Sequence, residues 1–175
     1  MRILAIDPGS EQSAWLVYDA GRQMPHRWPT GNLDGGITIN HDLFKAMGYR
    51  NPHTGTTWCW DLNLLAIEYM IPRGMPTSRA EMDTQFWAGR FVQSWDGPWR
   101  PIYSKDRKMH LCGVTRAKDA NIRQALIDRF PATGGGKCPQ VGTKKQPGPL
   151  YGIKADLWSA LAIAITAAET EVQDG

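Results

Sequence analysis

Three acidic residues stand at the edges of apolar segments that lie far apart in the chain. Asp7 ends the run RILAID, Glu68 ends LLAIE, and Asp156 opens LWSALAIAI. A carboxylate at the edge of a core is costly unless a cation or a hydrogen bond compensates its charge. Oxygen ligands of this kind suit Mg²⁺, which also binds substrate phosphate. The three acids therefore predict a divalent-cation site for phosphodiester hydrolysis, in which two ions clamp the attacking and leaving oxygens.

Each acid also has a structural interpretation of its own. Asp7 precedes Pro8 and Gly9, where an Asp is a common turn former, and an acid in the first turn of a helix, like Asp156, interacts favourably with the helix dipole. No turn or cap chemistry calls for Glu68 after LLAI. The order strand-Asp, meander, strand-Glu and helix-Asp favours one shared site over three separate structural roles.

The elements that must position these acids follow from the hydrophobic pattern and its breakers. Continuous apolar runs predict buried strands, and apolar residues at helical spacing predict amphipathic helices. Ser78 and Glu81 have the spacing of a helix capping box, and Thr115 is a second candidate cap. Strands are predicted at 2–7, 14–18, 35–39, 64–68 and 100–104, and helices at 41–47, 79–95, 116–130 and 154–169. The fold class is α/β, with an antiparallel meander and parallel strands in one mixed sheet flanked by helices.

Length and composition predict one globular domain over residues 1–175. Hydrophobic residues make up 42% of the 175 residues and charged residues 21%, which are ordinary globular values. The formal net charge of +3 permits an anionic partner. The segment 131–153 is rich in Gly, Pro and Lys and is expected to be a flexible basic loop. Three cysteines without a C-x-x-C pair, and no signal peptide or membrane-length apolar segment, predict a cytoplasmic protein that does not enter a membrane.

Four segments resemble those of a known nuclease family. ILAIDPGS, LLAIEYM and ADLWSALAIAI resemble the three signature segments of RuvC-type Holliday junction resolvases, which have the RNase H-like fold. IYSKDRKMHLCGVTRAKDANI is similar to the family's segment of a strand, a lysine, a glycine and a second lysine. The resemblance covers most of the chain and is poorest at 20–62 and 131–153.

The resemblance implies a metal site with named ligands. Asp7 would bridge two Mg²⁺ ions, Glu68 would bind one of them, and Asp156 would be a ligand from the last helix; Mn²⁺ is expected to substitute. Family members usually have a further acid where this chain has Ser159. A neutral hydroxyl is a poor ligand, so Ser159 either holds a metal-bound water or leaves the second ion weakly bound. Glu11 is an alternative acid, for which a solvated surface role is the better interpretation.

The resemblance also implies cationic catalytic residues and a DNA-binding surface. Lys108 and Lys118 match the family lysines that face the scissile phosphate, although Lys105 and Arg107 are alternatives to Lys108. The family inserts an aromatic side chain into the junction from the stretch after the strand glutamate, where this chain has no Phe. The expected DNA contacts are Tyr69, Met70, Ile71, Arg73, Lys105, Lys108, Arg116, Lys118, Lys144 and Lys145.

The expected function is therefore resolution of branched DNA by a homodimer in the cytoplasm of a bacterium or of a phage-infected host. The helix at 79–95 is the candidate dimer interface, with core packing as the alternative. Two other functions remain open. Ser159 favours a catalytically weak junction-binding module, and the initial strand-Asp-Gly pattern is also compatible with an actin-like phosphotransferase. The second requires two domains around ATP, for which 175 residues leave no room.

Overall fold

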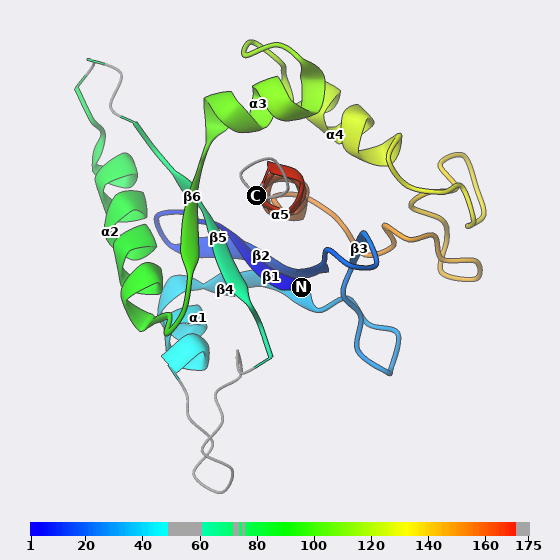
Figure 1. Cartoon of the computed structure of the whole chain (residues 1–175), viewed down its shortest axis with the longest axis horizontal. Helices are drawn as coiled ribbons and strands as arrows, with labels where there is room; N and C mark the ends of the chain where they lie inside the picture. The colour runs from blue at the N-terminus through cyan, green and yellow to red at the C-terminus, as the bar shows by residue number, and fades with distance from the viewer. Residues whose placement is uncertain (49–60, 72–73, 75, 171–175) are drawn as a thin grey trace, which may run out of the picture.

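The computed structural model describes residues 1–48, 61–71, 74 and 76–170. In this part of the chain, a mixed sheet of six strands carries helices on both faces (Figure 1). The architecture agrees with the α/β fold class predicted from the sequence. No helix within the described ranges is long and apolar enough to cross a membrane.

The sheet is built around the first strand. β1 (Arg2–Asp7) pairs antiparallel with β2 (Gln12–Asp19) and parallel with β5 (Leu64–Tyr69), beyond which β6 (Trp99–Tyr103) pairs parallel with β5. On the other side, β3 (Met24–Pro25) and β4 (Gly35–Ile39) pair antiparallel with different stretches of β2. The expected meander and parallel strands are both present, and β3 is an addition that sequence reasoning did not predict.

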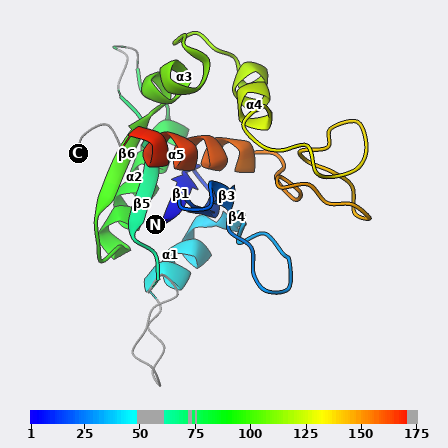
Figure 2. The same ribbon diagram turned by 45° about the vertical axis from the view of Figure 1, so that its right-hand side comes forward.

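The helices form one layer on each face of the sheet (Figures 1 and 2). α1 (Asn40–Gly48) and α2 (Arg79–Ser94) cover one face. α5 (Leu157–Thr170) packs on the other face, and α3 (Ser104–Cys112) and α4 (Asp119–Ile127) pack against α5. The predicted capping box is present at the start of α2, where Ser78 and Glu81 bond reciprocally.

The central strand is buried on both faces, as its continuous apolar sequence predicts. Ile3 and Ala5 belong to the core shared with α5, whereas Leu4 and Ile6 belong to the core shared with α1 and α2. All four side chains have 0% exposure. This alternation follows from the two-residue period of a strand, and it leaves the carboxyl end of β1 as the place where the chain leaves the core.

One helix was not predicted, and two others begin later than the sequence predicts. α3 occupies residues for which only a strand and a lysine-containing segment were expected. α4 begins at Asp119 rather than at 116, because the backbone of Lys118 is extended, with φ −84° and ψ 162°. α5 begins at Leu157 rather than at 154, because Ala155 has a left-handed backbone with φ 45°.

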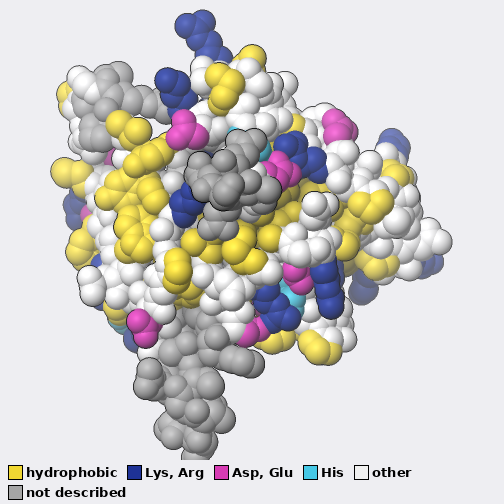
Figure 3. Space-filling view, in the orientation of Figure 1, with side chains coloured by type: hydrophobic (Ala, Val, Ile, Leu, Met, Phe, Trp, Pro, Cys, Tyr) yellow, Lys and Arg dark blue, Asp and Glu magenta, His cyan; other side chains and the backbone are white. Residues whose placement is uncertain are grey.

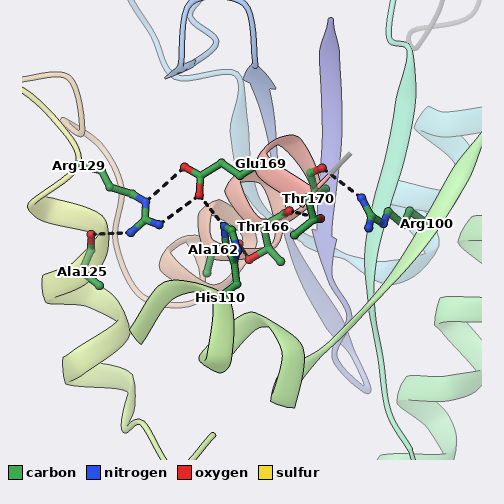
Figure 4. Close-up of polar contacts among 9 residues, drawn as sticks. Arg100, His110, Ala125, Arg129, Ala162, Thr166, Glu169 and Thr170 are labelled. Carbon is green, nitrogen blue, oxygen red and sulfur yellow. Dashed lines mark hydrogen bonds and ion pairs between the residues drawn. The ribbon is translucent and has the colours of Figure 1, made fainter. Parts of the chain in front are cut away.

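Glu169 near the end of α5 fixes the helical layer (Figure 4). Its Oε2 lies 2.5 Å from His110 Nε2 of α3 and accepts a 3.1 Å hydrogen bond from Arg129 after α4. Burial alone would raise the pKa of Glu169, but the hydrogen bonds from Arg129 and His110 outweigh burial and lower it. The network therefore joins the three helices on the α5 face.

Residues 131–153, called the basic knob below, form an ordered loop that projects from the body of the molecule (Figure 2). As expected, the segment contains no helix and no named strand, but backbone hydrogen bonds hold it together, among them Gly148 N to Val141 O at 3.0 Å and Leu150 N to Gln140 O at 2.8 Å. Gly142 has φ 75°, and a Cβ there would lie 2.2 Å from Gly148 N. Arg27 anchors the base of the knob by donating to Tyr151 O at 2.6 Å.

Candidate active site

The first two predicted acids lie at adjacent strand ends. β1 and β5 run parallel, and their register pairs Ile6 with Ile67, so Asp7 and Glu68 are the next residues along the two strands. Both are half-buried, whereas the residues before them have 0% exposure. The carboxyl ends of parallel strands are a common position for functional residues in α/β sheets. The sheet thus brings together two acids that are 61 positions apart in the sequence.

The two carboxyl groups interact strongly. The pKa of Asp7 is raised to about 8, first by burial and then by the negative charge of Glu68, a hydrogen bond with Glu68 and the charge of Asp156, while Arg107 opposes the shift. Like charges in a poorly solvated site disfavour the ionised form in this way. The arrangement is one that a bound cation would stabilise.

A buried arginine meets this pair of acids. Arg107, on α3, donates a 3.1 Å hydrogen bond from Nη1 to Glu68 Oε2, and the residue is only 6% exposed. Sequence reasoning named Arg107 only as an alternative to Lys108. The sequence carries no local signal for its role: Arg107 and Leu111 are the two buried residues of α3 and lie four positions apart on one face, but no apolar stripe accompanies them.

Two polar residues that were not predicted fix the turn after Asp7. Ser13 and Asn40 are each 1% exposed. Ser13 Oγ donates to Asn40 Oδ1 at 2.6 Å, and Asn40 Nδ2 donates to Gly9 O at 2.8 Å. A Cβ on Gly9 would lie 2.3 Å from Gln12 O. The turn therefore requires glycine at this position, and the buried polar pair holds the chain where it leaves Asp7.

The third acid lies beside the pair but is not joined to it. Asp156 is exposed in the turn directly before α5, and its carbonyl accepts hydrogen bonds from Ser159 N and Ala160 N at 3.0 and 3.1 Å. Its charge reaches Asp7, as the pKa of Asp7 shows. Ser159 is half-buried in the first turn of α5. Among the described residues, no group of three or more His, Cys, Asp or Glu side chains is arranged to hold an ion.

The chemistry of these donors nevertheless fits a divalent cation. Proteins commonly bind Mg²⁺ through one or two carboxylates, and water and substrate phosphate complete its coordination. Asp7 and Glu68 supply two such carboxylates in contact, and burial together with the charge of Glu68 raises the pKa of Asp7. Asp156 adds a further charge from the start of α5.

The two predicted catalytic lysines lie on or beside the helices α3 and α4. Lys108 is half-buried on α3, one residue after Arg107, and Lys118 is exposed at the residue before α4. Lys118 is thus a cap-position residue, not a residue of the first helical turn, and its backbone N donates to Asn121 Oδ1 at 3.0 Å. Within the described ranges neither lysine forms an ion pair with a carboxylate.

The remaining predicted DNA contacts fall into three groups. Lys105 and Arg116 are exposed in α3 and between α3 and α4. Lys144 and Lys145 are exposed on the basic knob, and dark-blue basic side chains appear along the outer edge of the molecule on that side (Figure 3). Arg73 lies outside the described residues.

Apolar side chains follow Glu68 at the end of β5. Tyr69 is 37% exposed and makes an edge-on contact with Tyr103, with ring centroids 6.4 Å apart. Met70 is half-buried, and Ile71 is 61% exposed. The stretch after Glu68, from which a side chain was expected to insert into the junction, thus presents an aromatic ring and an isoleucine side chain to solvent.

The outer face of α2 carries exposed apolar side chains. Phe86 and Met82 lie one helical turn apart and are 59% and 56% exposed. Arg90 lies over the rings of Phe44 and Trp87, with its Cζ 4.2 and 4.8 Å from their centroids. Hydrophobic side chains gather on the side of the molecule where α2 and β6 lie (Figure 3). This face is the α2 patch below.

The chain was compared with known proteins in three ways. No protein-family model matches the sequence, and no curated protein matches it. Solved structures do match. RuvC of Thermus thermophilus is 15% identical, with a TM-score of 0.60 over 99% of this chain and 97% of that one. Thermus thermophilus RuvC in complex with a Holliday junction substrate is 15% identical, with a TM-score of 0.56 over 98% of this chain and 96% of that one. The chain therefore has the RNase H-like fold of RuvC.

Proposed function

We propose that this protein is a metal-dependent endonuclease that resolves four-way DNA junctions, leaving 5′-phosphate and 3′-hydroxyl ends. The observation that carries the proposal is the meeting of Asp7 and Glu68 at adjacent strand ends, with the charge of Asp156 acting on Asp7. The chain that carries these acids has the fold of RuvC, and one solved structure of Thermus thermophilus RuvC contains a Holliday junction substrate.

Asp7, Glu68 and Asp156 would hold Mg²⁺, or Mn²⁺ in its place, and Ser159 would contribute through a water molecule. The bound metal would supply an activated water and would stabilise the charge that develops on the phosphodiester. The resemblance implies two ions per site. Ser13 and Asn40 hold the turn after Asp7, so its carboxylate is positioned before substrate arrives.

The DNA would cross the end of the sheet that carries these acids. Lys108 of α3 and Lys118, the residue before α4, would neutralise charge on the scissile phosphate. Tyr69, Met70 and Ile71 would contact bases at the branch point. Phosphate contacts are expected from Lys105 and Arg116, and from Lys144 and Lys145 of the basic knob.

Resolution of a junction needs two symmetric nicks, which a homodimer supplies through its two-fold axis. The α2 patch is our candidate dimer interface, because Phe86 and Met82 expose apolar surface on one helical face. Such a protein would work in the cytoplasm of a bacterium or of a phage-infected host, where its DNA substrate is found.

A second candidate function is junction binding with little cleavage. Two observations favour it: Ser159 is neutral, and the Glu68 carboxylate is already bonded to Arg107. An actin-like phosphotransferase is not supported, because the fold of RuvC accounts for 99% of the chain.

The experiment incubates the full chain with end-labelled four-way junctions and with linear duplex of the same sequence, with Mg²⁺ and with EDTA. Paired nicks at symmetry-related positions of the junction, dependent on Mg²⁺ and ligatable without further treatment, are the expected result. Retention of the junction without any nick would favour the binding module, and failure to bind the junction would refute both functions.

A further inference from the structure

The Glu68 carboxylate has a cationic partner within the protein. Arg107 donates to Glu68 Oε2 at 3.1 Å, and the two side chains are 7% and 16% exposed. The charge of Arg107 also acts on Asp7, where it opposes the effect of Glu68. The Arg107 guanidinium therefore interacts with both of the acids that would bind a metal ion.

Arg107 is held in the interior rather than at the surface. Its Nε is buried and has no hydrogen-bond partner among the described residues, and the whole residue is 6% exposed. A buried donor without a partner is costly. The side chain of Arg107 thus keeps its charge beside the acids although one of its donors is unsatisfied. Neighbouring Lys108 is half-buried and forms no ion pair with any residue that the structure describes.

The acids and Arg107 have a net charge suited to one divalent ion. Asp7, Glu68 and Asp156 supply three negative charges and Arg107 one positive charge, which leaves two negative units for one Mg²⁺ to neutralise. A fourth carboxylate in the first turn of α5 would call for more cationic charge, but that position is Ser159. The neutral Ser159 and the buried Arg107 therefore both reduce the cationic charge that the site needs from bound metal.

We propose that Arg107 is the resident cation of this site and takes the place of a second divalent ion, so that each site binds one. Arg107 acts through Glu68, as a positioning residue, by holding that carboxylate and supplying fixed positive charge. The inference rests on the proposed metal-dependent function and deepens it, since it concerns the number of ions at the same site.

The test counts bound Mn²⁺ on the full, metal-free chain, by equilibrium dialysis and by the electron paramagnetic resonance signal of bound Mn²⁺. The variants are Arg107→Met, Arg107→Lys and Lys108→Met, the last being the matched control on the adjacent cation. We expect one ion per chain in the wild type, Arg107→Lys and Lys108→Met, and a second ion in Arg107→Met. Thermal unfolding should show Arg107→Met destabilised without metal and restored by Mn²⁺, because the ion replaces the lost charge.

Two bound ions on the wild-type chain would overturn the inference and leave the proposed function intact. An unchanged count in a folded Arg107→Met variant would also overturn it, because Arg107 would then be an ordinary structural ion pair. If Arg107→Met does not fold, Arg107→Gln replaces it, since it keeps a donor for Glu68 without the charge, and the same count decides. A wild-type chain that binds no Mn²⁺ would refute the metal dependence itself, and with it the inference.

Discussion

Asp7 is the residue at which burial, charge and position act together. Its backbone ends a strand with buried neighbours, and burial together with Glu68 raises its pKa to about 8. A carboxyl group in this environment destabilises the metal-free protein when it is ionised, because the folded state holds its proton more tightly than the unfolded state. The same property favours binding of a divalent ion. Asp7 should therefore lower stability while it makes catalysis possible.

Replacing Asp7 with Asn should separate these two effects. We expect Asp7→Asn to abolish junction cleavage, because a metal ligand is lost, and to leave junction binding unchanged or tighter, because less negative charge faces phosphate. The metal-free variant should gain stability on the order of 1–3 kcal/mol, since its isosteric side chain carries no charge. Cleavage assays, gel-shift titration and urea unfolding measure the three effects. Glu11→Gln, in the turn after β1, is the control, and full cleavage by Asp7→Asn would refute the site.

Ser159 is the second residue at which a single change is informative. Ser159→Asp would restore a carboxylate in the first turn of α5 and should increase cleavage at low Mg²⁺, where ligand number limits metal binding. The double variant Ser159→Asp/Arg107→Met should cleave faster at low Mg²⁺ than either single variant, because Ser159→Asp adds a metal ligand and Arg107→Met removes a competing cation. Cleavage rates across a Mg²⁺ titration measure both effects. An unchanged Mg²⁺ dependence in Ser159→Asp would show that this position does not face the metal.

The candidate acids could be predicted from the sequence, whereas their partners could not. Asp7 and Glu68 end continuous apolar runs, and such runs identify strand ends without knowledge of the fold. Arg107 and Asn40 depend on tertiary contacts: Arg107 reaches Glu68 from a different element, 39 positions away, and Asn40 reaches Gly9 across 31 positions. No local pattern marks either residue, because isolated polar side chains in a sequence are usually solvated.

At the scale of elements, local signals decided which predictions were right. β1 and β4 were predicted with the observed bounds, and α2 with its capping box, because each has a continuous pattern or a strong cap. α3 was missed because its sequence, SKDRKMHLC, buries only Arg107 and Leu111 and so has no apolar stripe. β3 has two residues and exists only through its pairing with β2.

The contact of Glu169 with α3 and α4 predicts an effect of pH on stability. The folded pKa of Glu169 is lowered from its ordinary value of 4.5, so the network stabilises the fold above that pH and the contribution is lost as the pH falls through the folded value. The Glu169 side chain is 43% exposed, and its contribution should be roughly 0.5–1 kcal/mol. Glu169→Gln should unfold more easily than wild type at pH 7, and the difference should shrink as the pH falls below 4.5, as measured by urea unfolding. A constant difference across this range would contradict the assignment.

The basic knob predicts a salt-dependent contribution to DNA binding. It contains Lys137, Lys144 and Lys145 and no acidic residue, and all three lysines are exposed. If each contacts a phosphate, changing all three to Ala should lower the slope of log affinity against log salt by up to about 2.7. Fluorescence anisotropy with a four-way junction measures the slope. The control changes three exposed cations away from the knob, Arg22, Lys45 and Arg79, and an equal loss in both variants would show that the knob has no specific role.

The whole molecule separates the candidate active site from the candidate dimer interface. The acids lie at the carboxyl ends of β1 and β5, whereas the α2 patch lies on the outer side of the helical layer that covers one face. The fold of RuvC is retained at 15% identity because the two-sided burial of β1 and the helices on each face need only apolar residues at fixed periods. The proposed chemistry, in contrast, needs particular residues at particular positions, which the fold alone does not supply.

The proposed homodimer is tested by a charge placed on the α2 patch. Phe86→Glu puts a carboxylate on a side chain that is 59% exposed in the single chain, so its own fold should tolerate the change while an apolar interface should not. Sedimentation velocity should show a dimer for the wild type and a monomer for the variant. On a supercoiled plasmid with an extruded cruciform, the dimer should give linear product by paired nicking, and the monomer should give mainly nicked circles. Met24→Glu on β3, at a residue 37% exposed and outside both the α2 patch and the proposed DNA contacts, should behave as wild type. A dimeric Phe86→Glu variant that still makes linear product would place the interface elsewhere.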